Sequence, residues 1–313
     1  MKKIIFLILF FMGCKEVLPP SVGRSRDILV VTPYKDSLEI DISFVLEEIH
    51  YTPQPEKEFK LKYIPLDKFE AYSRYHAIFL LLLPKDAIYQ KYFKGLKTQD
   101  EFTLYKMDTV FAKNQTVLLL VGKDIKSLRR GIRKYRETIR YIFKQRLLKR
   151  LYAYTFIRGY NQTAMEKVKK YGFFIQIPKN FVLVEKHAPS KFIYLVAHNP
   201  DRNIFIYWQE KPRKIEPERL FPLRDSLTAF FYDGDYVERS LSTFREWNFK
   251  GYKGYRLEGV WQNERFTIGG PFVSYVFSTD KRFYFIDGIV FEPGKKKLSF
   301  LNQVEVILST FEP

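Results

Sequence analysis

Short apolar runs closed by proline or glycine mark the first half of this chain. The clearest runs are residues 28–32, 77–83 and 117–121. Their length fits buried strands and is far below the roughly 20 residues that a membrane-spanning helix needs. Residues 38–50 carry apolar side chains at helical spacing, whereas residues 89–113 show no clear period. This pattern predicts an α/β half built on a buried sheet.

Residues 123–156 follow with a sustained helical period, and they form the most polarised segment of the chain. Apolar residues from Ile125 to Ile142 step by three or four positions, which places them on one stripe. Residues 123–158 contain 13 Lys or Arg against two acids. Either this is a solvated basic face, or it is a docking face for anionic lipid or glycan. The candidate face consists of Arg129, Arg133, Arg136 and Arg140.

The pattern becomes rich in strands after Gly172. A helix with Pro217 in its first turn interrupts the strands, and an amphipathic helix over residues 298–310 closes the chain. We therefore predict an α+β fold of two α/β halves, residues 27–172 and 173–313. The second half is expected to be a sandwich of antiparallel strands with flanking helices. Its predicted strands are residues 173–177, 181–185, 192–197, 204–208, 252–262, 264–278 and 281–291.

The chain opens with the features of a secretion signal. Lys2 and Lys3 precede nine apolar residues, and Gly13 and Cys14 follow directly. We expect residues 1–13 to be removed as a lipoprotein signal peptide, Cys14 to be lipidated, and residues 14–26 to form a tether. Phe11 and Met12 depart from the usual Leu and Ala or Ser at these positions. Cys14 is the only cysteine, so the remaining chain cannot form an internal disulfide.

The charge balance narrows the expected partners. The formal charge is +18, and removing Lys2 and Lys3 lowers it to +16. On an exported protein, such a surplus favours lipid headgroups, lipopolysaccharide phosphates or acidic glycans over nucleic acid. An AT-rich genome, which enriches Lys, Ile, Phe, Tyr and Asn together, would produce a similar composition.

Motifs for catalysis are not recognisable in the sequence. The four histidines show no helical ligand spacing, and no nucleophile elbow, phosphate loop or dinucleotide fingerprint occurs. We therefore predict no metal ion, no cofactor and no catalytic residue. Whether the protein is an enzyme stays open, and the sequence favours a protein without enzymatic activity. Asp233-Gly234-Asp235 is interpreted as a turn because it lacks the spaced ligands of a calcium loop.

The most unusual string is the one over residues 269–275, where two glycines precede a proline. One interpretation is a β-bulge or a bend at the entrance of a strand. The alternative is a close approach of backbone to a ligand, with an arginine and aromatic rings on neighbouring strands forming a sugar-binding surface. The candidate binding residues are Arg256, Trp261, Gly269, Gly270 and Tyr275.

Several strings together resemble a known family, the Bacteroidota lipoproteins with domain of unknown function 4837. The resemblance implies an envelope location and an architecture, but no activity and no catalytic residue. Lys15-Glu16 resembles part of a surface-export signal, and the lack of Asp at position 15 is similar to lipoproteins kept in the outer membrane. The order of elements in the second half further resembles the sandwich of Mog1 and PsbP-type proteins. The strings lie at residues 18–24, 27–31, 224–226, 256–261, 269–275 and 287–296.

These observations favour a lipid-anchored protein of the outer membrane, on its periplasmic face or at the cell surface. We expect it to bind an envelope protein or an anionic glycan or lipid. The alternative is an envelope hydrolase acting on cell-wall or polysaccharide material, which would need a pocket of convergent carboxylates with raised pKa values. A third hypothesis is a passive assembly component, which would present an exposed apolar patch.

Overall fold

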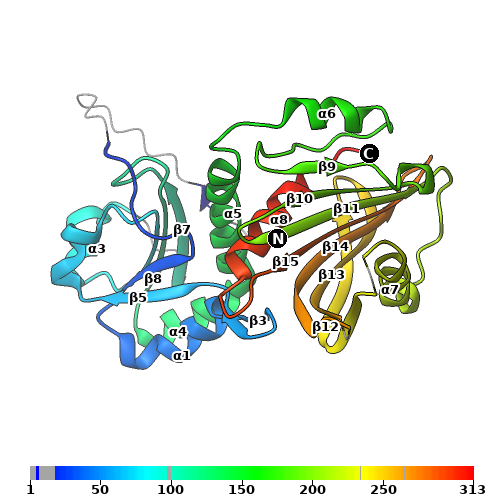
Figure 1. Cartoon of the computed structure of the whole chain (residues 1–313). Helices are drawn as coiled ribbons and strands as arrows, with labels where there is room; N and C mark the ends of the chain where they lie inside the picture. The colour runs from blue at the N-terminus through cyan, green and yellow to red at the C-terminus, as the bar shows by residue number, and fades with distance from the viewer. Residues whose placement is uncertain (1–4, 7–17, 97–99, 233, 264) are drawn as a thin grey trace. The chain divides into compact units, whose positions relative to one another are not determined.

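The computed structural model describes residues 5–6, 18–96, 100–232, 234–263 and 265–313. It divides into two compact units (Figure 1). The first comprises Met1–Glu48 and Lys57–Lys149, and the second comprises Ile49–Glu56 and Arg150–Pro313. The α+β class is confirmed. Cys14 and the other residues of the proposed lipidation signal, Ile5 and Phe6 apart, lie outside the described part of the chain.

The first unit is built on a six-stranded sheet with the order β1-β7-β8-β6-β2-β5. The middle strands β2, β6 and β8 run parallel, β7 is antiparallel to β8, and every residue of β6 and β8 is buried. Burial on both faces explains why these strands appear in the sequence as continuous apolar runs. The strands are β1 (Ile5–Phe6), β2 (Asp27–Val31), β5 (Lys60–Ile64), β6 (Ala77–Leu82), β7 (Phe102–Asp108) and β8 (Thr116–Gly122).

Helices complete the first unit. The segment without a clear period contains β7 and most of α3, and the first predicted helix ends at Leu46 rather than at residue 50. The predicted long basic helix is two helices, because the chain leaves helical geometry at Tyr135. A capping box between Asp124 and Ser127 starts the first of them. The helices are α1 (Lys35–Leu46), α2 (Phe69–Tyr72), α3 (Ala87–Tyr92), α4 (Ile125–Lys134) and α5 (Arg136–Thr155), which continues into the second unit.

Residues 18–26, which belong to the segment predicted as a tether, bond to the first unit. The Lys113 amide donates to the Pro19 carbonyl at 2.8 Å, and the Val22 amide donates to the Arg74 carbonyl at 2.9 Å. These bonds attach the segment to the first unit, so the prediction of a tether as far as residue 26 is wrong for residues 18–26.

The second unit is a seven-stranded antiparallel sheet with the order β12-β13-β14-β15-β11-β10-β9. Helix α7 covers one face and α8 covers the other (Figure 1), as the predicted sandwich with flanking helices requires. Side chains of β15 alternate between these faces, so Phe285 lies in the core under α7. The strands are β9 (Val182–Val184), β10 (Phe192–Ala197), β11 (Asp201–Gln209), β12 (Tyr236–Phe249), β13 (Tyr252–Asn263), β14 (Ile268–Ser278) and β15 (Phe283–Phe291), and the helices are α6 (Gln162–Lys169), α7 (Leu220–Phe231) and α8 (Leu298–Ser309).

Two features of the second unit differ from the prediction. Residues 150–172 belong to it, because the chain before α6 bonds to later segments: the Asn161 amide donates to the Ile177 carbonyl at 2.8 Å. Strand β12 was not predicted. It is the edge strand and mostly exposed, so it lacks the apolar alternation that marks buried strands.

A short hairpin, β3 (Ile49–Tyr51) and β4 (Pro55–Lys57), brings residues 49–56 into the second unit. The buried Glu56 carboxylate accepts hydrogen bonds from the amides of Lys297 and Leu298, at 2.6 and 3.0 Å. Glu56 thereby caps the N-terminus of α8. Among the helices described, none has both the length and the apolar character to cross a membrane.

Candidate functional site

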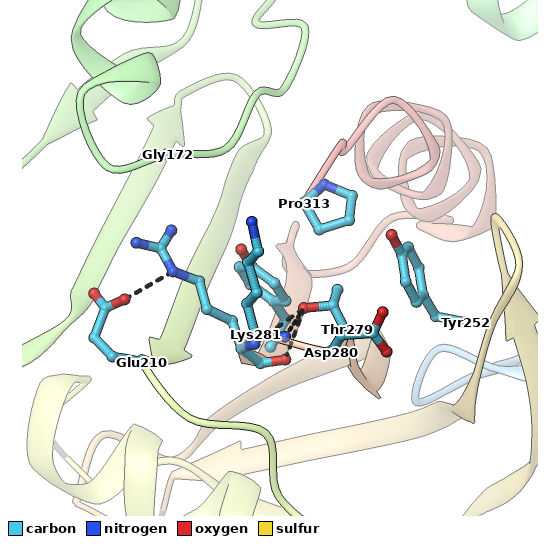
Figure 2. Close-up of a pocket in the computed structure, with 9 residues that line it drawn as sticks. Gly172, Glu210, Tyr252, Thr279, Asp280, Lys281 and Pro313 are labelled. Carbon is cyan, nitrogen blue, oxygen red and sulfur yellow. Dashed lines mark hydrogen bonds and ion pairs between the residues drawn. The ribbon is translucent and has the colours of Figure 1, made fainter.

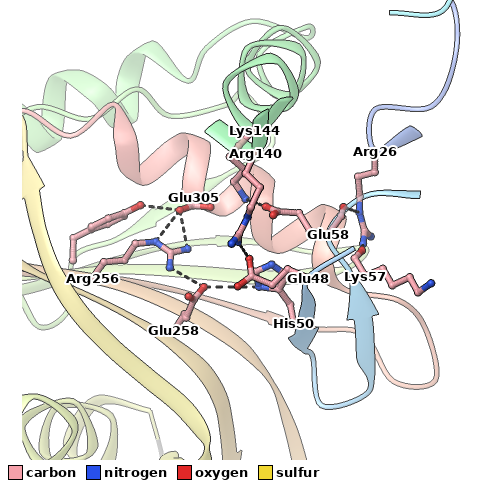
Figure 3. A network of polar contacts seen from close by, with 11 residues as sticks. Arg26, Glu48, His50, Lys57, Glu58, Arg140, Lys144, Arg256, Glu258 and Glu305 are labelled. Atoms are coloured by element: carbon pink, nitrogen blue, oxygen red, sulfur yellow. Dashed lines mark hydrogen bonds and ion pairs between the residues drawn. The ribbon is translucent and has the colours of Figure 1, made fainter. Parts of the chain in front are cut away.

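Two of the predicted binding residues, Arg256 and Tyr275, meet on the face of the sheet that α8 covers. The Arg256 guanidinium donates to Oε1 of Glu305 at 3.0 Å, and the Tyr275 hydroxyl donates to the same oxygen at 2.9 Å. Arg256 is only 6% exposed and Tyr275 only 4%. Both side chains are therefore committed to a helix of their own unit instead of an open surface. Figure 3 shows Arg256 facing Glu305.

Glu258 extends this network toward the 49–56 hairpin. Its carboxylate lies 2.7 Å from Nη1 of Arg256 and 4.0 Å from Nδ1 of His50 (Figure 3). Burial raises the pKa of Glu258, but the Arg256 guanidinium outweighs burial and leaves this pKa below its ordinary value. Burial also raises the pKa of Tyr275, so its phenol stays protonated and donates to Glu305. The network joins the hairpin, β13, β14 and α8 within the second unit.

Trp261 lies on the opposite face, in the core under α7, and is 2% exposed. Gly269 and Gly270 pair in regular register with Gln262 and Trp261, so the predicted bulge is not present. A Cβ on Gly270 would lie 2.0 Å from the Val290 carbonyl oxygen. The close approach that requires glycine is thus to strand β15 and not to a ligand. The five candidate residues do not line one cleft, so a sugar-binding surface at these positions is wrong.

A second buried network, missed from the sequence, lies on the α7 face. The Arg224 guanidinium donates to both oxygens of Asp287 at 2.7 and 3.2 Å, and the Ser274 hydroxyl donates to Oδ2 at 2.6 Å. The Arg224 guanidinium carbon also lies 4.1 Å from the centroid of the Phe272 ring. These residues come from three of the strings that carried the family resemblance. Arg224 is a charged residue on an otherwise apolar face of α7, and this feature of the sequence could have predicted a buried ion pair.

The predicted basic face is paired with acids of the first unit. Arg129 and Arg133 lie 3.1 and 2.8 Å from the carboxylate of Asp41 on α1. Arg136 lies 3.1 Å from Glu137, and Arg140 pairs with Glu48. Each of the four arginines therefore has an acidic partner, which lowers the charge that the face presents to an anionic surface.

Open polar surface in the second unit lies at the strand ends where the β12–β13 and β14–β15 hairpins turn. A pocket of about 540 Å³ opens on the side of α8 (Figure 2). Arg282 is held at its wall by Glu210, at 2.8 Å, and by the Tyr171 carbonyl, at 2.6 Å. Figure 2 shows Lys281 and Tyr252 reaching to the same side as Pro313. The lining residues are Gly172, Glu210, Tyr252, Thr279, Asp280, Lys281, Arg282, Tyr284 and Pro313.

Glu210 is held ionised in this pocket. The Lys191 ammonium, 3.0 Å away, lowers its pKa, and the Trp208 indole and the Arg282 guanidinium act in the same direction. A carboxyl group with a lowered pKa is a poor proton donor near neutral pH. The pKa values of Glu70, Glu101, Asp124, Glu238 and Glu258 are lowered too.

A groove of about 640 Å³ opens near the same strand ends. Lys253 directly follows Tyr252, and Ser278 directly precedes Thr279, so adjacent residues line the groove and the pocket. We call the residues lining the two cavities the hairpin-end surface. The residues lining the groove are Arg213, Ile215, Glu246, Trp247, Asn248, Lys253, Gly254, Tyr255 and Ser278.

The groove combines aromatic rings with cations. Trp247 is 39% exposed, and Tyr255 is half-buried on the neighbouring strand. Tyr255 pairs with Glu246 and Trp247 with Gly254, so the two rings project from opposite faces of the sheet at the strand ends that line the groove. Arg213 and Lys253 form no ion pair with any acid in the described part of the chain, and Glu246 is the carboxylate in the lining. This composition suits a ligand that offers flat apolar faces together with negative charge.

Comparison with known proteins gives a family but no activity. Residues 161–310 match the family model described as "Domain of unknown function (DUF4837)". A crystal structure from Bacteroides thetaiotaomicron VPI-5482 is similar, with 10% sequence identity and a TM-score of 0.28. The similar region covers 45% of this chain and 44% of that chain, so the chain spans less than half of that protein. No curated protein matches the sequence.

Proposed function

Residues 161–310 belong to the family with domain of unknown function 4837, and we propose that this domain is the binding module of a lipid-anchored envelope protein. The hairpin-end surface is the proposed ligand site. The observation that carries the proposal is the groove in which Arg213 and Lys253, without acidic partners, lie among the same lining residues as Trp247 and Tyr255.

The proposed ligand is an acidic glycan. Aromatic rings pack against the apolar faces of sugars, and guanidinium and ammonium groups pair with carboxylate or phosphate substituents. The groove volume of about 640 Å³ falls within the roughly 300–1,000 Å³ of small-ligand sites. A few sugar units would fill it.

Binding is favoured over hydrolysis by the state of the nearby carboxyl groups. Glycoside hydrolysis needs a carboxylic acid that stays protonated beside the scissile bond. Glu210, in the adjoining pocket, has a lowered pKa and is committed to Lys191 and Arg282.

Titration calorimetry of the purified protein tests the site, with alginate oligosaccharides as the acidic probe and dextran oligosaccharides as the neutral one. Charge-assisted hydrogen bonds contribute about 1.5–3 kcal/mol each, so Arg213→Gln or Lys253→Gln should weaken alginate binding about tenfold or more. Lys179→Gln, which changes an exposed lysine outside both cavities, serves as the control. Equal binding of alginate by the wild type and the Arg213→Gln, Lys253→Gln double variant would refute the proposed site.

The anchor is proposed from the signal over residues 1–13 that precedes Cys14, and the proposed location is the outer membrane. Labelled palmitate should enter the wild-type protein and fail to enter Cys14→Ala. Palmitate incorporation into Cys14→Ala, with retention in the membrane fraction, would overturn the anchor. If the ligand is an envelope protein instead of a glycan, crosslinking in intact cells should identify it.

A further inference from the structure

The first unit contains a basic pocket that the glycan proposal does not use. It has a volume of about 400 Å³ and lies between α5 and the β7–β8 hairpin. Three cations, Lys106, Arg146 and Lys149, line it against one carboxylate, Asp108. Asp108 is engaged by Lys106 at 2.6 Å and by the Thr116 hydroxyl at 2.7 Å. The pocket therefore has a surplus of positive charge on the side of α5.

Lys149 and Tyr141 are the exposed members of this lining. Tyr141 is 64% exposed, and Lys149 is exposed and forms no ion pair within the described part of the chain. Arg146 is half-buried and donates to the Asn114 carbonyl, so its guanidinium is held in the pocket wall. A fixed guanidinium and an exposed ammonium that line the same pocket suit a phosphate group.

Residues 19–21, which follow the proposed anchor Cys14 along the sequence, contact the first unit beside this pocket. The Lys113 amide donates to the Pro19 carbonyl at 2.8 Å, and the Ser21 hydroxyl donates to the carbonyl of Asn114, a lining residue, at 3.2 Å. Five peptide steps separate Cys14 from Pro19, so a fully extended segment spans at most about 18 Å. A lipid on Cys14 would thus hold the pocket close to the membrane surface.

We propose that this pocket binds the phosphate of anionic lipid headgroups in the membrane that holds the anchor. The inference rests on the proposed lipid anchor and adds a second, headgroup-specific contact to it. Basic residues near an anionic membrane surface each add about 1 kcal/mol of attraction, so the pocket would orient the anchored protein against the headgroups. Tyr141 lies at the pocket with its amphipathic ring exposed, as aromatic residues do at membrane interfaces.

The test uses the lipidated full-length product reconstituted in vesicles. Cys14 is the only cysteine and its sulfur would carry the lipid, so Gln145→Cys places a single reactive thiol at the pocket for a fluorophore. Nitroxide-labelled headgroups then quench the fluorophore when the pocket docks. We expect strong quenching in vesicles of equal parts phosphatidylcholine and phosphatidylglycerol, and weak quenching in phosphatidylcholine alone.

Charge reversal identifies the pocket as the docking site. Each basic residue near an anionic surface contributes about a fivefold factor in binding, so Lys149→Glu should lower the docking equilibrium constant about thirtyfold. Lys85→Glu changes an exposed lysine that follows the far end of β6, and it should have little effect.

Three results of the quenching experiment would overturn the inference. These are equal quenching in both vesicle types, unchanged docking in Lys149→Glu, and an equal loss in Lys85→Glu, which would indicate nonspecific attraction. Release by millimolar inorganic phosphate, but not by chloride at the same ionic strength, would support phosphate recognition. Saturation by inorganic phosphate at micromolar concentration would make a free phosphate the ligand and refute the headgroup. Palmitate labelling reports on the anchor separately, so failure of the pocket and failure of the anchor are distinguishable.

Discussion

Arg224 on α7 and Asp287 on β15 form a two-pronged ion pair in which the side chains are 0% and 1% exposed. The Ser274 hydroxyl satisfies the same carboxylate from the neighbouring strand β14. Because a buried charge without a partner is costly, each member of this pair requires the other. The pair thereby fixes the position of α7 on the sheet.

Removing the acid should be strongly destabilising. Asp287→Leu leaves the Arg224 guanidinium buried without a counter-charge, and the expected loss is about 3–5 kcal/mol of unfolding free energy. Urea denaturation followed by circular dichroism measures this loss.

The double variant Arg224→Met, Asp287→Leu removes both charges and should be more stable than Asp287→Leu alone. A double variant whose loss equals the sum of the two single losses would show that the two side chains act independently, which contradicts the pairing.

Gly288→Ala should displace α8 from the sheet. A Cβ at this position would lie 2.0 Å from Cγ1 of Val304, and overpacking of this kind costs about 1–3 kcal/mol. Gly95→Ala is the matched control, because a Cβ there meets nothing within 4 Å. Denaturant midpoints report both effects. Adding Val304→Ala should restore part of the loss, and a failure to do so would place the strain elsewhere.

Glu56→Ala should loosen the first turn of α8. The substitution removes the acceptor for the Lys297 and Leu298 amides and costs about 0.5–2 kcal/mol. Hydrogen exchange measured residue by residue should show faster exchange at these two amides. Glu56→Gln, which keeps an acceptor without the charge, should give a smaller effect. Unchanged exchange in Glu56→Ala would contradict the cap.

Glu258 should contribute to stability in a pH-dependent way. Its pKa in the folded protein is below the ordinary 4.5, so its ionised form stabilises the fold above pH 4.5, and this contribution falls as acid protonates it. Glu258→Gln should therefore flatten the loss of stability below pH 4.5. Urea titrations across this range measure the slope, and an identical slope in wild type and variant would exclude the contribution.

The sequence already indicated that two of the predicted binding residues lie on opposite faces of the sheet. Arg256 and Trp261 are five positions apart on one strand, and an odd spacing places two side chains on opposite faces. The pairing of Arg256 with Tyr275 depends instead on the register between β13 and β14, and the sequence alone did not specify that register. Glu305, which joins them, lies 49 residues from Arg256.

The sequence by itself determined the elements whose burial produces a local pattern of apolar residues. Strands β6 and β8 are apolar at nearly every position because both faces of a parallel sheet are covered, and α8 carries a helical apolar period. The edge strand β12 produces no such pattern, since it is largely exposed.

Only the tertiary structure decided which charged side chains form ion pairs and which lie at the surface without an acidic partner. Asp41 pairs with Arg129 and Arg133 from a segment 88 or more residues away, and Arg224 finds Asp287 across 63 residues. By contrast, Arg213, Lys253 and Lys149 keep no acidic partner in the structure as described. Local sequence gives the number of charges, but their pairing depends on contacts between distant segments, which form only when the chain folds.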